Sequence, residues 1–255
     1  MPGRFLKKRG STINLRSSIR HQNFFRRTKK VAPALLGLVK GQIDNLRLRK
    51  KLNLRQIVFI EGGAHTGELF TNQLTKYLKV KFWWGGTRYF FKLLNLNEAE
   101  FYLFEPNPKH IATLKRYQSK YPDNRIEVIN AACWVDHGKM KLFPAIGHYG
   151  DRGNTLHIEK KEKLDVDNAI ETSTVNLSKY IQEKFLPDDY LILQLDIEGS
   201  EFEVIKDLLR SGVISYINEL YVEWHVYCFP EKEDDFQYLI HQIERIPGLT
   251  YSAFY

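Results

Sequence analysis

The chain has 255 residues, of which 43% are hydrophobic, so one α/β domain with an extension can bury a full core. Residues 1–55 hold 16 Lys and Arg against the single acid Asp44, whereas the remainder holds 22 Lys and Arg against 29 acids. A core domain that reads nucleic acid would carry its own basic face, so this distribution argues against that class. Cys133 and Cys228 lie 95 positions apart, which argues against a disulfide framework or a zinc knuckle and favours a reducing, cytoplasmic compartment.

Residues 1–55 are expected to form a basic arm and an amphipathic helix ahead of the main domain, residues 56–255. The composition of residues 1–30 is typical of a disordered or loosely helical arm. Contact with an anionic membrane or another polyanion, and an organelle-targeting role, stay open for this segment. The apolar run over residues 31–39 is too short to span a bilayer, so the sequence predicts no transmembrane segment.

The first strand is expected over residues 57–60, followed by a glycine turn. Gly62, Ala64 and Gly67 nearly satisfy the spacing of a nucleotide-binding turn, in which glycines allow a ligand to approach the backbone. Glu61 stands at the end of the strand, where its carboxylate would repel the pyrophosphate of NAD or FAD. It suits a ligand with a cationic amino-acid end, such as S-adenosylmethionine (AdoMet). The alternative is a turn that serves chain geometry only.

A helix is expected over residues 68–80, followed by an aromatic insert over 81–100. The insert is interpreted as a satellite hydrophobic cluster, with a lid over the ligand or a membrane-facing patch as alternatives. The next strand, 101–104, ends at Glu105, and Pro106 to Pro108 favour the start of a helix that runs to about Lys120. Ligands of open α/β sheets lie beyond the carboxyl ends of the strands, where an acid can bind both hydroxyls of a ribose.

The rest of the chain continues to alternate strands with helices. Strands are expected over 125–132, 139–143, 190–195, 219–224 and 249–254, helices over 176–185, 200–209 and 236–246, and a long polar loop over 144–171. This alternation predicts a doubly wound, mostly parallel sheet with helices on both faces.

Four stretches of the sequence resemble the FkbM family of AdoMet-dependent O-methyltransferases in their order and spacing. They are IEGGAHTGE (60–68), LFEPNPKH (103–110), VINAACW (128–134) and LQLDIEGSEFEVI (193–205). The resemblance covers residues 57–255. It implies a class I methyltransferase (Rossmann-like) fold and methylation of a hydroxyl on a sugar, a glycan or a related polar natural product. The chain ends one strand after its last helix, so the antiparallel strand pair of many class I sheets is expected to be incomplete or rearranged.

The resemblance also implies a set of cofactor-binding residues. They are Glu61, Gly63, Ala64, His65, Gly67, Glu105, Pro106, Asn107, Ala131, Ala132 and Asp196. Glu61 and His65 stand where the family more often has Asp and Asn. Both replacements keep a polar function, so we expect AdoMet to be the cofactor.

Methyl transfer to a hydroxyl requires an aligned oxygen and the removal of its proton. Asp196 closes the fourth expected strand, and Glu198 follows two residues later. Glu223 and His225 close the neighbouring fifth strand. We expect Asp196, Glu198 and His225 to be catalytic. Asp196, Glu223 and His225 could supply oxygen and nitrogen ligands to Mg²⁺ or Mn²⁺.

Several polar residues near these positions have other interpretations. Glu201 and Glu203 lie in the first turn of a helix, where the dipole favours acids, and His225 could be a structural histidine at the edge of the core. In the polar loop, Asp151, Arg152, Asn154 and His157 are of the types that build acceptor-side loops.

Two other functional classes stay open. An NAD-type oxidoreductase is opposed by Glu61 and by the lack of a Tyr-x-x-x-Lys dyad at the expected place. The second class is a non-catalytic module that binds RNA or an anionic surface through the basic arm. A methyltransferase that acts on nucleic acid or protein stays open as a variant within the methyltransferase class.

Overall fold

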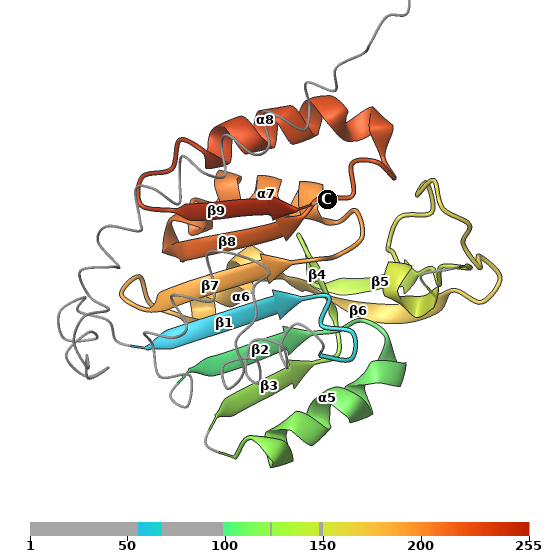
Figure 1. The fold of residues 1–255 in the computed structure, drawn as a ribbon, viewed down its shortest axis with the longest axis horizontal. Coiled ribbons are helices and arrows are strands. Elements are labelled where there is room, and N and C mark those ends of the chain that lie inside the picture. The colour runs from blue at the N-terminus through green and yellow to red at the C-terminus, as the bar shows by residue number, and fades with distance from the viewer. Residues whose placement is uncertain (1–55, 68–98, 123, 148–149, 255) are drawn as a thin grey trace, which may run out of the picture. The chain divides into compact units, whose positions relative to one another are not determined.

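The structure is a computed structural model that describes residues 56–67, 99–122, 124–147 and 150–254 (Figure 1). The predictions for the basic arm, the amphipathic helix, the helix over 68–80 and the aromatic insert up to residue 98 lie outside the described residues. Within those ranges, no helix is long and apolar enough to cross a membrane. Both cysteines are buried free thiols.

A sheet of six parallel strands forms the centre of the described fold, in the order β3-β2-β1-β7-β8-β9. The strands are β1 Ile57–Gly62, β2 Glu100–Phe104, β3 Arg125–Ile129, β7 Tyr190–Leu195, β8 Ile217–Glu223 and β9 Thr250–Phe254. All six arrowheads point to the same end of the sheet (Figure 1). The strand order reverses between β1 and β7, which opens a ligand crevice at their carboxyl ends. This topology confirms the predicted doubly wound α/β fold.

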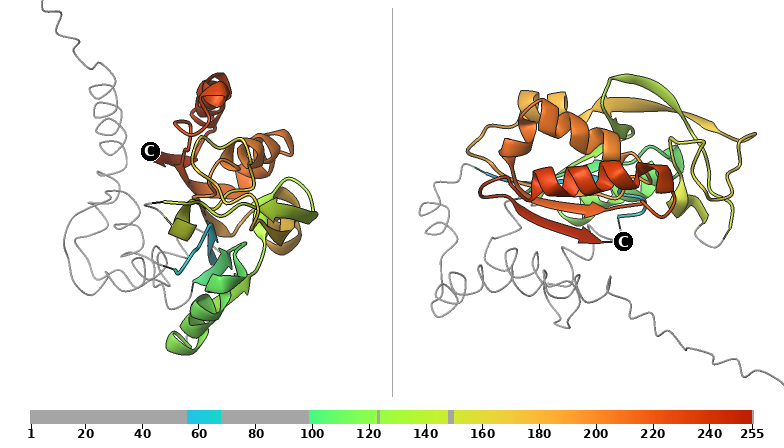
Figure 2. Two further views of the ribbon diagram at one scale, coloured as in Figure 1. Left: turned by 90° about the vertical axis from the view of Figure 1, so that its right-hand side faces the viewer. Right: turned by 90° about the horizontal axis from the view of Figure 1, so that it is seen from above.

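Helices α6 Leu177–Lys184, α7 Glu201–Arg210 and α8 Glu233–Ile243 pack on one face of the sheet (Figure 2). Val58 and Ile60 of β1 form one buried core with Phe202 of α7 on that face. Side chains alternate along a strand, so Phe59 points to the opposite face. Its ring lies 5.9 Å from the ring of Phe101. The sheet is therefore buried on both faces along β1, as expected of a parallel sheet.

Local sequence signals set the helix starts. Helix α5, Pro108–Lys120, begins as predicted because Asn107 accepts the Lys109 N–H with its side chain and proline occupies the first helical position. The helix predicted over 236–246 instead spans Glu233–Ile243. Its first turn carries three acids, which the positive end of the helix dipole stabilises.

A second sheet of three strands, in the order β4-β6-β5, corrects two predictions. The strand predicted over 125–132 is two strands, because β3 ends at Ile129 and β4, Ala132–Trp134, pairs with β6. Between them, the Asn130 side chain donates hydrogen bonds to the carbonyls of Glu105 and Pro106, which turns the chain out of the main sheet.

Strand β6, Ile170–Asn176, begins at the end of the predicted polar loop, ends at the predicted helix start, and otherwise covers residues for which no element was predicted. Its sequence IETSTVN buries Thr172 and Thr174 and exposes Ser173 between them, so the strand pattern is present with polar residues on its buried side. Strand β5, Gly138–Leu142, pairs antiparallel with β6 close to its predicted position. Strand β9 runs parallel to β8 at the edge of the main sheet, which is a rearranged closure of the kind expected.

Candidate active site

A pocket of about 360 Å³ opens where the carboxyl ends of β1, β2, β7 and β8 meet. Most of the predicted site residues line it, namely Glu61, Gly63, Ala64, His65, Glu105, Pro106, Ala132, Asp196, Glu198, Glu223 and His225. Residues from the cofactor-binding, catalytic and metal-ligand predictions thus share one cavity. Three predicted cofactor residues, Gly67, Asn107 and Ala131, do not line it.

Those three residues shape the surroundings of the pocket. Gly67 has φ 77°, and a Cβ there would lie 2.6 Å from the ring of Tyr117. Asn107 caps α5 and donates its backbone N–H to Glu105. Ala131 is buried, and its N–H donates to the carbonyl of Ile129 at the end of β3.

Glu61 is a buried carboxylate whose two oxygens have no hydrogen-bond partner among the described residues. Only 1% of the residue is exposed, and burial raises its pKa well above the usual range, with further contributions from Asp196 and Glu105. An unpaired buried acid is costly, so the pocket favours a cationic ligand group at this point. Gly63 has φ 81°, and a Cβ there would lie 1.8 Å from the Asp196 carbonyl oxygen, so only glycine lets this turn approach β7.

Glu105 is held rigidly at the end of β2. One carboxylate oxygen accepts the N–H of His65 at 2.6 Å, and the other accepts the N–H of Asn107 at 2.8 Å. Burial raises the pKa of Glu105 to about 7, although these two hydrogen bonds oppose the shift. Each oxygen keeps a second lone pair for a ligand hydroxyl.

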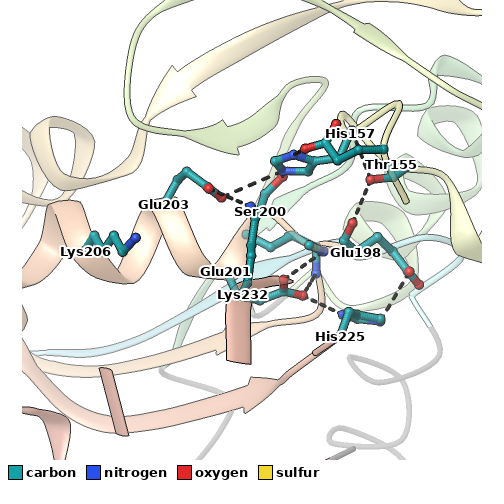
Figure 3. Close-up of polar contacts among 12 residues, drawn as sticks. Thr155, His157, Glu198, Ser200, Glu201, Glu203, Lys206, His225 and Lys232 are labelled. Atoms are coloured by element: carbon teal, nitrogen blue, oxygen red, sulfur yellow. Dashed lines mark hydrogen bonds and ion pairs between the residues drawn. The ribbon is translucent and has the colours of Figure 1, made fainter. Parts of the chain in front are cut away.

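Four carboxylates, from Asp196, Glu198, Glu201 and Glu223, gather around the buried His225, and we call these five residues the acidic cluster. The imidazole Nδ1 lies 2.7 Å from Glu201 Oε1, and Nε2 lies 3.2 Å from Glu198 Oε2 and 3.7 Å from Asp196 Oδ1. Figure 3 shows Glu201 and Glu198 reaching His225 from two sides. The turn after β7 supplies Asp196 and Glu198, α7 supplies Glu201, and the end of β8 supplies Glu223 and leads to His225.

The protonation equilibria of this cluster are strongly shifted. Burial alone would lower the pKa of His225, but Glu201 and Glu198 outweigh it and hold the pKa well above its usual value. Burial and the neighbouring Glu223 raise the pKa of Asp196. The single imidazolium cannot neutralise all four carboxylates. The cluster can therefore accept a proton or hold a cation.

Glu201 has a larger role than its position in the first turn of a helix suggested. It is 0% exposed, and besides His225 its carboxylate accepts the backbone N–H groups of Ile197 and Gly199. These contacts close the turn after β7 and orient the imidazole. Glu203 fits its structural interpretation, because it pairs with Lys232 at 2.7 Å.

Lys160, which the sequence did not single out, ties the polar loop to the acidic cluster. Its buried ammonium lies 2.6 Å from Glu198 Oε2 and 2.8 Å from Glu162 Oε2, and it donates to the Gly153 carbonyl at 3.0 Å. The sequence around a lysine in a polar loop does not predict that the side chain is buried, so this contact is seen only in the folded structure.

The structure brings together a set of possible metal ligands that shares two members with the predicted set. Ligand atoms of Asp196, Glu198 and His225 all lie within 4.8 Å of one another, so these three residues could hold a metal ion together. Glu223 lines the same pocket, and its role as a ligand stays a prediction. Glu198 adopts φ 55°, a strained conformation for a residue with a side chain.

A second group of ionisable side chains lies beside the pocket and contributes His65 and Asp151 to its lining, and we call it the histidine cluster. It consists of His65, Lys109, His110 and Asp151. The Asp151 carboxylate lies 3.2 Å from His65 Nε2, 3.3 Å from His110 Nε2 and 2.7 Å from Lys109 Nζ. Burial and the neighbouring His65 lower the pKa of His110.

Three of the four polar-loop residues singled out from the sequence line the pocket. Asp151, Arg152 and Asn154 line the pocket, together with Tyr227, which is 59% exposed. His157 points elsewhere: it is buried, and its Nε2 lies 3.3 Å from the hydroxyl of Ser200 (Figure 3).

The methyltransferase FkbM domain matches this sequence over residues 61–245. A curated protein, ABC transporter C family member 15 of Dictyostelium discoideum, is 31% identical over 77 residues, which are 30% of this chain and 5% of that protein. The crystal structure of methyltransferase FkbM from Methylobacillus flagellatus KT is similar with 14% identity and a TM-score of 0.35, covering 61% of this chain and 30% of that chain. The chain thus spans a minor part of each of these two proteins.

The domain match extends over most of the chain and contains the strand ends that build the pocket. It includes the glycine turn with Glu61, the end of β2 with Glu105, and the acidic cluster. The chain therefore belongs to the FkbM family of S-adenosylmethionine-dependent methyltransferases.

Proposed function

We propose that this protein transfers the methyl group of AdoMet to a hydroxyl of a sugar, a glycan or a related polar natural product. The observation that carries the proposal is the pocket itself. It holds the unpaired Glu61 and the oriented Glu105 on one side and the acidic cluster on the other. One cavity thus offers a place for the cofactor and a proton acceptor for the hydroxyl.

The residues of the cofactor wall fit AdoMet, which would supply an electrophilic methyl group. The buried carboxylate of Glu61 would pair with the ammonium of the amino-acid end, which would relieve its unpaired burial. Glu105 would accept hydrogen bonds from the ribose hydroxyls with its remaining lone pairs. An NAD pyrophosphate would meet these two acids and Asp196 together, which argues against the oxidoreductase alternative.

Asp196 is the proposed general base. It lines the pocket at the end of β7, beside the glycine turn, where an acceptor oxygen could face both the methyl group and the carboxylate. His225 and Glu198 complete the catalytic group, and Glu201 acts as a positioning residue through His225 Nδ1. Asp196 would take the proton of the acceptor hydroxyl when the methyl group leaves the sulfur of AdoMet for the oxygen, and S-adenosylhomocysteine would be released.

The acidic cluster also fits Mg²⁺ or Mn²⁺. Asp196, Glu198 and His225 would hold the ion, with Glu223 beside them, and an ion there would polarise the acceptor hydroxyl. Activity that is lost in EDTA and restored by Mg²⁺ or Mn²⁺ would support metal assistance. Full activity in EDTA would leave Asp196 as a base without a metal.

The rim of the pocket supports a polar acceptor. Asp151, Arg152 and Asn154 offer hydrogen-bonding groups, and the exposed ring of Tyr227 offers an apolar face on which a sugar ring can lie. The basic arm is the feature that favours the alternative, an acceptor made of nucleic acid.

A transfer screen with labelled AdoMet against glycans, small polyols, nucleosides and RNA tests the proposal. We expect label in a glycan or polyol, and we expect Asp196→Asn to lower turnover by about 10²-fold or more while AdoMet affinity stays unchanged. Label in RNA alone would favour the alternative acceptor. Full turnover by Asp196→Asn would overturn the assignment of the base.

A further inference from the structure

The histidine cluster has the composition of a transition-metal site, and the proposed removal of the hydroxyl proton does not use it. Two imidazole nitrogens and a carboxylate face one another within 4.8 Å. This donor set suits Zn²⁺ and other borderline divalent ions better than Mg²⁺, which prefers oxygen ligands only. It also differs from the acidic cluster, where carboxylates predominate.

The separations between the candidate ligand atoms are close to those of a zinc site. With metal–ligand bonds of about 2.0–2.1 Å, the ligand atoms of a tetrahedral site lie about 3.3–3.4 Å apart. In the structure, each Asp151 oxygen faces one histidine: Oδ1 lies 3.2 Å from His65 Nε2, and Oδ2 lies 3.3 Å from His110 Nε2. One ligand atom from each of the three residues lies within 4.8 Å of the other two. The three side chains would need only small adjustments to share one ion.

His110 gives an independent indication of a missing ligand. It is 5% exposed, and its Nε2 atom makes no hydrogen bond within the described part of the chain, although Asp151 Oδ2 is close. The atom is therefore near the carboxylate but not aligned with it. A buried ring nitrogen without an aligned partner is a rare and costly feature, and a metal ion held between the two side chains would satisfy it.

His65 is oriented as a metal ligand would be. Its Nδ1 atom lies 3.2 Å from the hydroxyl oxygen of Thr66, which can accept a hydrogen bond from Nδ1–H. That arrangement leaves the Nε2 lone pair facing Asp151. Outer hydrogen bonds of this kind commonly fix the ring and tautomer of metal-binding histidines.

We propose that His65, His110 and Asp151 form a zinc site that joins three segments around the cofactor pocket. The glycine turn supplies His65, the first turn of α5 supplies His110, and the 3-10 helix at Gly150–Gly153 supplies Asp151. Since the last segment also carries Arg152, the ion fastens the acceptor-side loop to the cofactor wall. The proposal does not depend on the identity of the acceptor.

Lys109 competes for the same carboxylate. Its ammonium lies 2.7 Å from Asp151 Oδ2, but 72% of its side chain is exposed, so it can move into solvent. A bound ion takes its place. Removing this lysine should therefore leave the affinity for zinc unchanged or raise it. If the four side chains form only a surface ion-pair cluster, neither the wild type nor the variant should bind zinc.

The test is a titration of the metal-stripped full chain with Zn²⁺ by calorimetry, with Co²⁺ absorbance as the report on coordination. We expect the wild type to take up at least one ion per chain, at the histidine cluster. Loss of a ligand in His110→Ala should weaken binding by about 100-fold or more, since changes outside the first shell already cost 10- to 100-fold. Lys109→Ala should bind at least as tightly as the wild type.

Two control variants locate the ion. His137→Ala removes an exposed histidine outside the cluster and should bind like the wild type. Asp196→Asn removes a ligand from the acidic cluster, so it should lose only the uptake at that cluster and keep the uptake that depends on His110. Should His110→Ala fail to fold, Asp151→Asn replaces it, because that side chain is 30% exposed. No uptake by the wild type, unchanged uptake in folded His110→Ala or Asp151→Asn, or loss of the His110-dependent uptake in Asp196→Asn would each overturn the proposal.

Discussion

The acidic cluster and the histidine cluster lie around one pocket and have opposite arrangements of charge. In the acidic cluster a single histidine, His225, is surrounded by carboxylates and is 2% exposed. In the histidine cluster a single carboxylate, Asp151, is surrounded by two imidazoles and an ammonium, and 30% of its side chain is exposed. Each cluster also contains one strained residue, His65 with φ 47° and Glu198 with φ 55°.

The difference shows how burial and neighbours decide what a carboxylate can do. The hydrogen bond from Lys109 holds the pKa of Asp151 down to about 2, and the nearby histidines add to this effect. Burial and the adjacent Glu223 instead raise the pKa of Asp196. Asp151 is therefore a permanent anion suited to a fixed cation, whereas Asp196 is suited to exchanging a proton with a ligand.

The largest effect on stability should come from the acidic cluster. Glu201→Ala leaves a buried imidazolium and two backbone N–H groups without their acceptor, so we expect a loss of about 3–5 kcal/mol in the free energy of unfolding. Chemical denaturation would measure it. Glu203→Ala, two residues along the same helix, is the matched control and should cost below about 1 kcal/mol because its pair with Lys232 is partly exposed. Equal losses in the two variants would contradict the special role of Glu201.

An intermediate effect, on AdoMet affinity, is expected at Glu105, which links the histidine cluster to the proposed cofactor site. Glu105 accepts the N–H of His65, and it is the proposed acceptor for the ribose hydroxyls. Glu105→Ala should weaken AdoMet binding by about 1.5–3 kcal/mol, the usual cost of losing hydrogen bonds to a charged group. Calorimetry would measure the affinity, and Glu100→Ala, at the other end of β2, is the control. Unchanged affinity would remove Glu105 from the cofactor site.

The smallest effect should come from the histidine cluster without metal. Asp151→Ala breaks partly exposed ion pairs, so we expect a loss of stability below about 1 kcal/mol. Added Zn²⁺ should widen the gap: at 100 times its dissociation constant, an ion stabilises the wild type by about 2.7 kcal/mol and the variant by much less. Thermal unfolding with and without Zn²⁺ would measure both the loss of stability in the variant and the stabilisation by zinc. Equal zinc-induced shifts would place the ion elsewhere.

The sequence alone determined the elements that rest on local signals. The apolar run of β7 and the capping residues of α5 predicted the bounds of both elements because burial and capping act within a few residues. Glu61, Glu105 and Asp196 were identified as strand-end acids, and a parallel sheet brings strand ends to one edge.

Only the tertiary structure decided which of these side chains meet. Glu201 and His225 are 24 positions apart, Lys160 and Glu198 are 38 apart, and His65 and Asp151 are 86 apart. Strand β6 escaped prediction because its buried residues are threonines, which resemble those of a polar loop until a partner strand covers them. Such pairings depend on the paths of intervening loops, and no local pattern in the sequence records those paths.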